Sequence, residues 1–299
     1  MTQPQPRTLI VGCGYLGRRV GRLLSNRGER VFGTTRSAAR SAELARWGVE
    51  AVVVDVLAPD SLANLPTADR ALYCVGFDRS AGVPIHQVYV DGLRLTMGRL
   101  LDRVGSLVYA SSTGVYGGDD GGWVDEDSPT GPRTESGRAC LDAEGVIRDF
   151  EADGRLPATI LRYSGLYGPD RLMRREALIR GEEIIGDPEK ILNLVHIDDA
   201  AAAAVAALDR ARGGELYLVS DDRPAPRREY YRLAAEALKA PVPRFRPPTP
   251  GTGESSREGS NKRVSNRRMH AGLGVTLSYP DITTGVPAAL AAVDEDRSP

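Results

Sequence analysis

Short apolar runs alternate with longer amphipathic stretches over the first half of the chain. The runs cover residues 8–11, 30–36, 51–54, 71–75, 107–110 and 158–161. Stretches with helical spacing lie between them, near residues 37–47, 85–104 and 135–151. Short strands that are apolar on both faces are typical of buried parallel sheets, and their alternation with helices is typical of doubly wound folds. The pattern therefore predicts an α/β fold with a doubly wound parallel sheet, which binds ligands at the carboxyl ends of its strands.

The first run leads into a glycine-rich turn, Gly-x-Gly-x-x-Gly, and then into a helix. Gly12 allows the turn out of the strand, and Gly14 leaves no Cβ between the backbone and a pyrophosphate. Gly17 lets the helix pack close to the sheet, while Tyr15 and Leu16 complete the turn. The N–H groups and the positive dipole end of the helix would then face the phosphates. Because strand, turn and helix follow in this order, the motif predicts a dinucleotide site.

The end of the second strand bears on the choice of cofactor. An Asp or Glu there would hydrogen-bond the ribose 2′-hydroxyl of NAD, whereas an Arg accommodates the 2′-phosphate of NADP. This chain carries Thr34, Thr35 and Arg36 and no acid. A guanidinium pairs with a phosphate in a bidentate way, and hydroxyls can donate to it. We therefore hypothesise NADP in preference to NAD; the alternative is that Arg36 is a solvated charge opening the next helix.

The next two strand ends supply further candidate contacts to the cofactor. Asp55 ends the third strand, where its side chain could reach the adenine edge or serve as a cap or turn residue. Val75 and Gly76 end the fourth strand and are small enough for a cofactor ribose to pass.

Composition narrows the class of protein. The chain has 299 residues, of which 41% are hydrophobic and 26% charged, as in a globular protein with a large core. Its 39 basic and 40 acidic residues give a net charge of -1, which offers no general attraction to nucleic acid or anionic membranes. The three cysteines lack paired spacing, so we expect a reduced, cytoplasmic setting; the three histidines are too scattered to suggest a metal site. No apolar run approaches the length of a membrane span.

Hydroxyl groups gather where the fifth strand ends. Ser111 and Ser112 lie there, where a hydroxyl can bond a substrate carbonyl or hydroxyl as its charge changes. Here the chain resembles the extended, epimerase/dehydratase branch of the short-chain dehydrogenase/reductase superfamily. The resemblance is carried by the motifs at residues 12–17, 111–117, 125–129, 161–169 and 194–200. It implies a Rossmann-type fold, a nicotinamide cofactor and a catalytic serine, which we assign to Ser112 with Ser111 as its neighbouring candidate.

The resemblance also implies a catalytic Tyr-x-x-x-Lys pair, which this chain lacks. In the register set by Gly137 and Glu144, the Tyr position falls on Ser136 and the Lys position on Cys140. The position of an assisting Asn falls on Tyr89. A serine hydroxyl cannot readily exchange a proton near neutral pH without an adjacent base. The chain is therefore similar to an atypical subgroup of the superfamily in which the pair is commonly lost.

Tyr116 is the sequence candidate for a relocated acid/base. It lies four residues after Ser112, in the loop over the expected nicotinamide position. The alternative is that its ring packs under the cofactor loop.

The last third of the chain predicts a smaller, discontinuous substrate domain. We expect a Rossmann domain over residues 7–165 and 191–220, and the substrate domain over 166–190 and 221–299. Arg171, Lys262 and Arg263 are candidates for contacting an anionic substrate group, with a solvated surface as the alternative. We further expect a mobile loop over 241–259, a docking helix over 281–293 and a frayed tail over 294–299.

These features predict an NAD(P)-dependent oxidoreductase or epimerase that acts on a sugar-like or nucleotide-linked small molecule by hydride transfer. The alternative is a non-catalytic NADP(H)-binding sensor or scaffold, because the usual catalytic pair is missing. We expect no nucleic-acid partner, since the basic cluster over 262–268 is a small footprint. In many relatives the two long helices form a dimer interface, and Gly92, Gly98, Arg94 and Arg99 leave a homodimer open here.

Overall fold

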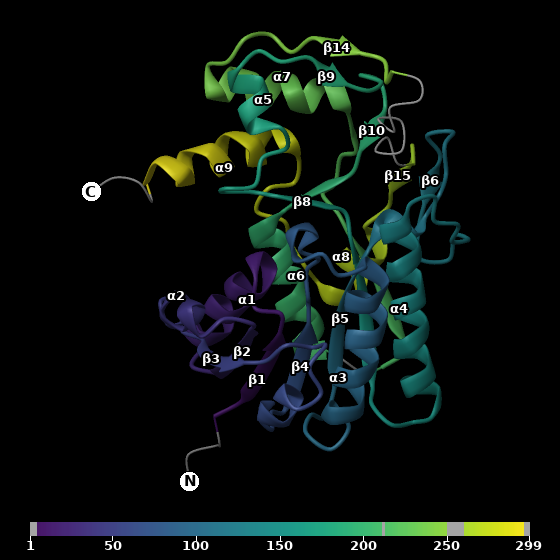
Figure 1. The fold of residues 1–299 in the computed structure, drawn as a ribbon. Helices are drawn as coiled ribbons and strands as arrows, with labels where there is room; N and C mark the ends of the chain where they lie inside the picture. Colours follow the sequence, from purple (N-terminus) through teal and green to yellow (C-terminus); the bar gives the residue numbers. More distant parts are fainter. Residues whose placement is uncertain (1–4, 211–212, 250–259, 296–299) are drawn as a thin grey trace.

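A seven-stranded parallel sheet forms the centre of the larger domain (Figure 1). The computed structural model describes residues 5–210, 213–249 and 260–295, so much of the loop expected over 241–259 and most of the tail over 294–299 lie outside the described residues. The strand order is β12-β7-β5-β4-β1-β2-β3. The strands are β1 (Arg7–Val11), β2 (Arg30–Thr35), β3 (Glu50–Val53), β4 (Arg70–Tyr73), β5 (Leu107–Ser112), β7 (Ala158–Tyr163) and β12 (Glu215–Val219). The predicted Rossmann-type doubly wound sheet is confirmed.

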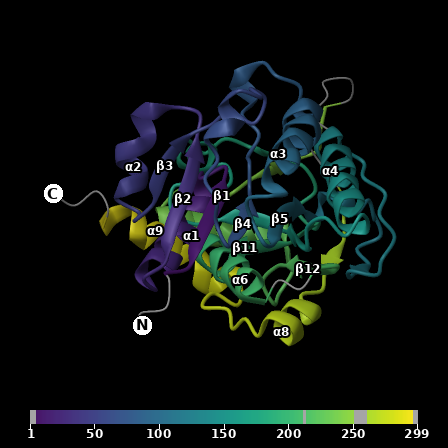
Figure 2. The same ribbon diagram turned by 90° about the horizontal axis from the view of Figure 1, so that it is seen from below.

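Helices cover both faces of this sheet (Figure 2). One face packs against α1 (Tyr15–Asn26), α6 (Ile197–Arg210) and α8 (Arg267–Leu273), and the other against α3 (Gly92–Leu100) and α4 (Glu135–Ala152). Alternate strand residues supply the two cores: Ile10 faces α1 and α6, whereas Leu9 and Val11 face α3. The homodimer that we expect through α3 and α4 stays a prediction.

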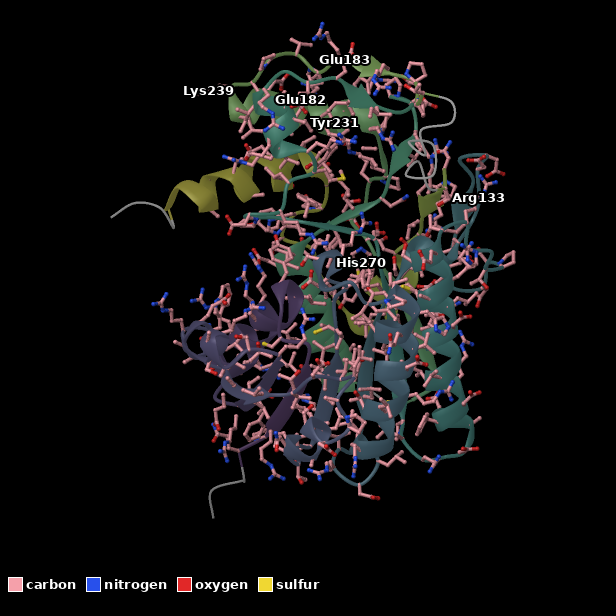
Figure 3. All side chains as sticks on the ribbon, viewed as in Figure 1. Arg133, Glu182, Glu183, Tyr231, Lys239 and His270 are labelled. Atoms are coloured by element: carbon pink, nitrogen blue, oxygen red, sulfur yellow. The ribbon has the colours of Figure 1, made fainter. Side chains whose placement is uncertain are left out.

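The smaller domain lies above the carboxyl ends of the strands (Figure 1). Its helices are α5 (Arg175–Ile179), α7 (Arg227–Leu238) and α9 (Ile282–Glu295), the last over the expected docking segment. Its short strand pairs are β8 (Gly165–Tyr167) with β11 (Leu194–His196), β9 (Ile184–Ile185) with β14 (Phe245–Arg246), and β10 (Ile191–Leu192) with β13 (Ala225–Pro226). In Figure 3, Tyr231 and Lys239 mark this domain, whereas His270 lies at the junction with the larger one. The carboxyl ends of the strands, where the sheet pattern predicts the ligand site, thus face the smaller domain.

Part of the segment expected in the smaller domain, residues 221–299, packs against the larger one. Met269 and Leu273 of α8 are buried in the same core cluster as α1 and α6. Just before α8, β15 (Arg263–Val264) pairs with β6 (Trp123–Val124) of the larger domain. The apolar side chains of α8 are thus buried against the sheet face beside α6.

Two expected helices are shorter or less regular than their patterns suggest. The stretch near 37–47 forms a 3-10 turn, η1 (Ala38–Arg40), followed by the short α2 (Ser41–Ala45). The stretch near 85–104 begins with a π-helical turn, η4 (Gln87–Asp91), before α3 starts at Gly92. Turns of π-helix recur at functional sites, and this one holds Tyr89 near the strand ends.

Candidate functional site

A cavity of about 280 Å³ opens where the strand order reverses, between the ends of β1 and β4. Most of the predicted cofactor residues line it: Gly12, Gly14, Thr34, Thr35, Arg36, Asp55, Val75 and Gly76. They come from the ends of β1, β2, β3 and β4, whose parallel direction brings these ends to one edge of the sheet. This is the switch point at which doubly wound sheets bind their ligands.

The glycine turn leaves room for a diphosphate at the start of α1. Gly12 has a φ of 87°, and a Cβ on it would lie 2.6 Å from Val75 Cα, so only glycine fits this turn. On Gly14 a Cβ would meet only Gly12 O, at 4.0 Å. The helix has no capping side chain and no acidic residue in its first turn. Its free N–H groups therefore suit an anion, and the residues present fit a dinucleotide.

Thr34 and Thr35 line the cavity, and Thr34 also holds the glycine turn in place. The Gly12 N–H donates to Thr34 Oγ1 at 2.8 Å, and the Cys13 N–H donates to Thr34 O at 3.0 Å. The Ser37 N–H donates to Thr35 Oγ1 at 3.3 Å. Both threonines are buried. The Thr34 hydroxyl thus fixes the phosphate turn, whereas the Thr35 hydroxyl bonds the backbone of Ser37 just after β2. The sequence pattern did not suggest either role.

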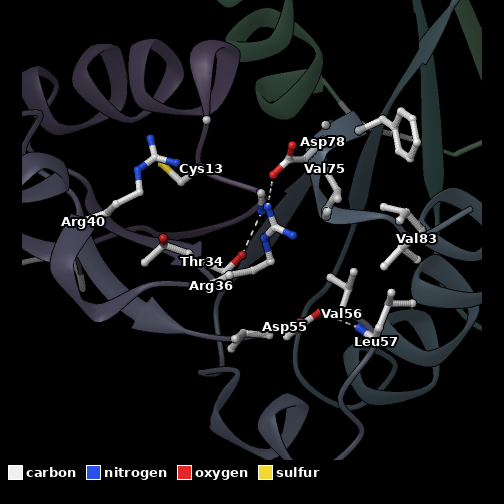
Figure 4. A pocket seen from close by; sticks show the side chains of 18 residues that line it. Cys13, Thr34, Arg36, Arg40, Asp55, Val56, Leu57, Val75, Asp78 and Val83 are labelled. Carbon is white, nitrogen blue, oxygen red and sulfur yellow. Dashed lines mark hydrogen bonds and ion pairs between the residues drawn. The ribbon is translucent and has the colours of Figure 1, made fainter. Parts of the chain in front are cut away.

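Arg36 reaches across the cavity to an acidic residue that sequence reasoning missed. Its Nη2 lies 2.9 Å from Asp78 Oδ2, in the loop after β4 (Figure 4). Arg40 also lines the cavity, and its Nε donates to Glu43 Oε2 at 3.1 Å. Arg40 follows Arg36 by four residues, a spacing that could have indicated a second phosphate contact. Nothing local in the sequence marks Asp78 as a partner of Arg36.

The remaining cofactor candidates have mixed roles. Asp55 lines the cavity, but its Oδ1 also accepts the Leu57 N–H at 3.0 Å, so it shapes the turn after β3. Gly76 is exposed and a Cβ there would meet open space. Leu16 and Gly17 are buried under the helix rather than in the cavity lining, and a Cβ on Gly17 would lie 2.9 Å from Ile10 Cγ2. Gly17 therefore permits the close packing of α1 on β1.

The two serines after the fifth strand face different surroundings. Ser112, half-buried, accepts the Gly114 N–H on its Oγ at 3.0 Å, which orients the hydroxyl at the carboxyl end of β5. Ser111 is buried, and its Oγ donates to Glu144 Oε1 at 2.6 Å. Glu144 in turn forms a buried ion pair with Arg162, at 2.6 Å. The Glu144 contact gives Ser111 a structural role, and the catalytic roles of Ser111 and Ser112 stay predictions.

Tyr116 does not have the geometry expected of an acid/base. Its side chain is only 1% exposed, and its hydroxyl donates to Asp125 O at 2.8 Å. The same hydroxyl accepts from Arg162 Nη1 at 2.5 Å. Burial raises the pKa of Tyr116, although the Arg162 charge opposes that rise. Tyr116 instead packs under the loop, the alternative that the sequence left open.

The positions of the missing catalytic pair are a surface serine and a buried thiol. Ser136 is exposed near the start of α4. Cys140 is 6% exposed and packs in a cluster with Val115, Tyr116 and Val264. Burial raises the pKa of the Cys140 thiol to about 12, so the thiolate is strongly disfavoured.

Tyr89 is the half-buried phenol beside this cluster, and sequence reasoning treated it only as a lost Asn. Its ring packs against the Cys140 cluster, and its centroid lies 6.3 Å from that of Phe77, which lines the cavity. Burial raises the pKa of Tyr89, while the Phe77 backbone and the Arg171 charge oppose the rise. Tyr89 thus lies between the cavity and the loop that holds Tyr116. The π-helical turn that places it had no clear signal in the sequence.

The predicted substrate residues lie on separate elements rather than in one cluster. Arg171 follows β8 and is exposed, with its guanidinium 5.3 Å from the centre of the Tyr15 ring. Tyr15 itself donates its hydroxyl to Pro169 O at 2.9 Å, so it links the phosphate turn to the smaller domain. This contact places Arg171 above the start of α1.

Lys262 and Arg263 lie against the loop that follows β5. Lys262 is 6% exposed, and its Nζ donates to Tyr116 O at 3.2 Å and to Ser260 Oγ. Burial and the charge of Lys190 lower the pKa of Lys262 to about 8. The Arg263 guanidinium donates to Gly121 O, which fixes the β6 loop. Lys262 is a buried cation held against the loop after β5, whereas Arg263 has a structural contact with the β6 loop.

The part of the chain that the structure describes gives no support for a metal site or a membrane-spanning helix. It contains no group of three or more His, Cys, Asp or Glu side chains able to hold a metal ion. Nor is any helix among the described residues long and apolar enough to span a bilayer.

Comparison with known proteins shows the family and agrees with the fold. Protein YeeZ of Escherichia coli K12 is 30% identical over 286 residues, covering 92% of this chain and 97% of YeeZ. A solved structure of a conserved protein of unknown function from Silicibacter pomeroyi is 29% identical, with a TM-score of 0.77 over 97% of this chain and 100% of that one. UDP-glucuronic acid 4-epimerase from Bacillus cereus, in complex with UDP-glucuronic acid and NAD, has the same fold at 18% identity, with a TM-score of 0.79 over 97% of this chain and 99% of that one. The model of the NAD-dependent epimerase/dehydratase family matches residues 8–220, and the chain belongs to that family, within the extended short-chain dehydrogenase/reductase superfamily.

Proposed function

We propose that the protein is an NAD(P)-dependent oxidoreductase or epimerase that acts on a nucleotide-linked sugar by hydride transfer. The observation that carries this proposal is the cavity at the switch point, with the open N-terminus of α1 beside it. A nicotinamide dinucleotide bound there would supply the hydride acceptor or donor. Gly12 and Gly14 would bind its diphosphate, and Ser112 would hydrogen-bond the reacting substrate oxygen.

A nucleotide-linked sugar is the substrate class to test first, for two reasons. The Bacillus cereus fold neighbour was solved with UDP-glucuronic acid and NAD. In this chain, Lys262 presents a buried cation beside the loop after β5, where an anionic group of a substrate would be attracted. Arg171 is a second cation near the phosphate turn.

The proposed cofactor preference is NADP over NAD. Arg36 and Arg40 both line the cavity near the end of β2, where the ribose 2′ position is recognised. NAD-binding sites carry an acidic residue at the end of the second strand, which bonds the ribose 2′-hydroxyl. The cavity-lining Asp55 follows β3 and not β2, so it is not in that position.

Nucleotide binding is tested by fluorescence titration of the purified protein with NADPH and with NADH. We expect micromolar binding of NADPH, weakened about tenfold or more in Arg36→Ala because a bidentate phosphate contact is lost. Arg30→Ala, at the other end of the same strand, is the matched control and should bind as the wild type does. If neither nucleotide binds, the cavity is not a dinucleotide site.

Turnover is tested with UDP-glucuronic acid and UDP-glucose in the presence of NADP⁺ or NAD⁺, by product analysis and absorbance at 340 nm. We expect Ser112→Ala to lower turnover by about a factor of 10² while nucleotide binding is kept, since Ser112 is proposed to bond the reacting oxygen. An unchanged rate would remove Ser112 from the mechanism.

A second candidate function is a non-catalytic NADP(H)-binding sensor or scaffold. It is favoured by the replacement of the catalytic pair with an exposed Ser136 and a buried Cys140. It predicts nucleotide binding without turnover, so conversion of any sugar nucleotide by the wild type would exclude it.

A further inference from the structure

An ion pair spans the adenosine end of the cavity. Arg36 follows β2, Asp78 lies in the loop after β4, and both line the cavity. Arg36 Nη2 is 2.9 Å from Asp78 Oδ2, while 58% of the Arg36 side chain and 44% of that of Asp78 remain exposed (Figure 4). The pair therefore joins the two walls between which a nucleotide must enter.

The Asp78 carboxylate is held in place by its own turn. Its Oδ1 accepts the Ser80 N–H at 3.0 Å and the Ser80 hydroxyl at 2.6 Å, so Asp78 caps the 3-10 turn η3 (Arg79–Ala81). Oδ2 is left to face Arg36. Hydrogen bonds from Ser80, and then the Arg36 guanidinium, lower the pKa of Asp78, so the group is ionised at neutral pH.

Among the charged residues around the cavity, Asp78 has the strongest influence on how a phosphate would bind at this end. The charged residues that line it are Arg36, Arg40, Asp55 and Asp78. Arg40 is already paired with Glu43, which also accepts from Arg18 at 3.0 Å. Asp55 bonds the Leu57 N–H after β3. Arg36 is thus the main cation for a phosphate here, and Asp78 occupies it.

We propose that Asp78 is a specificity-determining residue, which engages Arg36 and thereby limits the preference for NADP(H) over NAD(H). The inference rests on the proposed nucleotide site. A ribose 2′-phosphate must take Arg36 from Asp78 and also meets the repulsion of that carboxylate. NAD(H) carries a hydroxyl at this position and leaves the ion pair intact. The ratio of the two affinities therefore depends on Asp78.

The test compares NADPH and NADH affinities of the wild type and Asp78→Asn. Asparagine removes the charge but keeps an oxygen that can cap the η3 turn, so the loop should fold normally. We expect NADPH to bind about three- to fivefold more tightly, as for removal of an exposed competing charge, and NADH to change less than about twofold. The matched control is Glu50→Gln, which removes the carboxylate that pairs with Arg30 at 2.7 Å on the other end of β2.

A double-mutant cycle asks whether Asp78 acts through Arg36. In the Arg36→Ala background, Asp78→Asn should improve NADPH binding by less than half as much, on a logarithmic scale, as in the wild type. An unchanged ratio of NADPH to NADH affinity in Asp78→Asn, an equal gain in Glu50→Gln, or a full gain without Arg36 would each overturn the inference and leave the nucleotide site standing. If the wild type binds neither nucleotide, the proposed function fails and this inference fails with it.

Discussion

At the scale of single residues, Tyr116 and Tyr89 differ in how deeply their side chains are buried. Tyr116, in the loop after the catalytic serine position, is buried with its hydroxyl held by Arg162 and Asp125. Tyr89, where the family resemblance implies an Asn, is half-buried between Phe77 and the Cys140 cluster. We therefore propose Tyr89 as the phenol able to exchange a proton with a bound substrate.

The matched substitutions Tyr89→Phe and Tyr116→Phe distinguish the roles of the two tyrosines. We expect Tyr89→Phe to lower turnover of the sugar nucleotide by about a factor of 10² with nucleotide affinity unchanged, because only the proton donor is lost. Tyr116→Phe should instead lower the free energy of unfolding by about 1–2 kcal/mol, since it leaves the buried Arg162 guanidinium and the Asp125 carbonyl without their hydroxyl partner. Turnover and urea unfolding, measured on both variants, check these outcomes. Normal turnover in Tyr89→Phe would rule it out as the acid.

Sequence reasoning located residues whose roles are local and missed those whose roles depend on distant partners. The glycine turn and Arg36 follow directly from neighbouring residues in the chain, and the structure brings them together at one cavity. Asp78 meets Arg36 only because β1 lies between β2 and β4 in the sheet. Tyr116 was assigned from its distance to Ser112, which says nothing of the buried Arg162 that holds its hydroxyl.

At the scale of elements, one buried network ties β5, β7 and α4 together. Glu144 of α4 is fully buried and accepts from Arg162 of β7 at 2.6 and 2.9 Å. It also accepts from Ser111 of β5. A charged pair in a core stabilises little by itself, but removing one partner leaves the other charge buried and unpaired.

Arg162→Met tests this network. We expect the free energy of unfolding to fall by about 3–5 kcal/mol, because the Glu144 carboxylate loses its buried partner. Arg148→Met is the control, since Arg148 lies 3.9 Å from Glu144 but is 58% exposed; it should cost less than about 1 kcal/mol. Urea unfolding of the two variants measures both values, and equal effects would contradict the role of the buried pair.

The strands of the central sheet were largely predictable from the sequence, because most of their residues are buried. The strands in short apolar runs were placed within one or two residues, because helices cover both faces of the sheet and bury most of these strands. The helix near 85–104 was less predictable, since η4 and α3 share the same apolar spacing and differ only in local winding. The pairing of β15 with β6 joins segments too short to show any period.

At the scale of the whole molecule, His196 marks the junction of the two domains. It ends β11 and is 1% exposed, with its ring between those of Tyr167 and Tyr279 at centroid distances of 5.3 and 3.9 Å. Nδ1 accepts the Asp198 N–H at 3.4 Å, and Nε2 has no hydrogen-bond partner among the described residues. Burial lowers the pKa of His196 to about 4, although the Asp198 carboxylate opposes this.

The pKa of His196 predicts loss of stability in mild acid. Between about pH 6.5 and 4 the unfolded chain binds a proton at this imidazole and the folded chain does not, so stability falls as the pH falls. We expect the histidine to account for about 2 kcal/mol of the loss between pH 7 and 5. His196→Gln should shrink the loss by that amount, and His86→Gln, at an exposed position, should not. Urea unfolding at pH 7 and pH 5 measures the loss of stability in the wild type and in both variants. Equal losses in all three proteins would contradict the prediction.

The packing of α8 on the larger domain affects how this protein can fold during its synthesis on the ribosome. The sheet face that Met269 and Leu273 cover is built from strands synthesised long before them. Until that late segment has emerged, the apolar surface beside α6 and β12 stays exposed to water. The nucleotide-binding half therefore cannot complete its core during synthesis of its own strands, and a chain truncated near residue 260 should aggregate rather than yield an independent Rossmann domain.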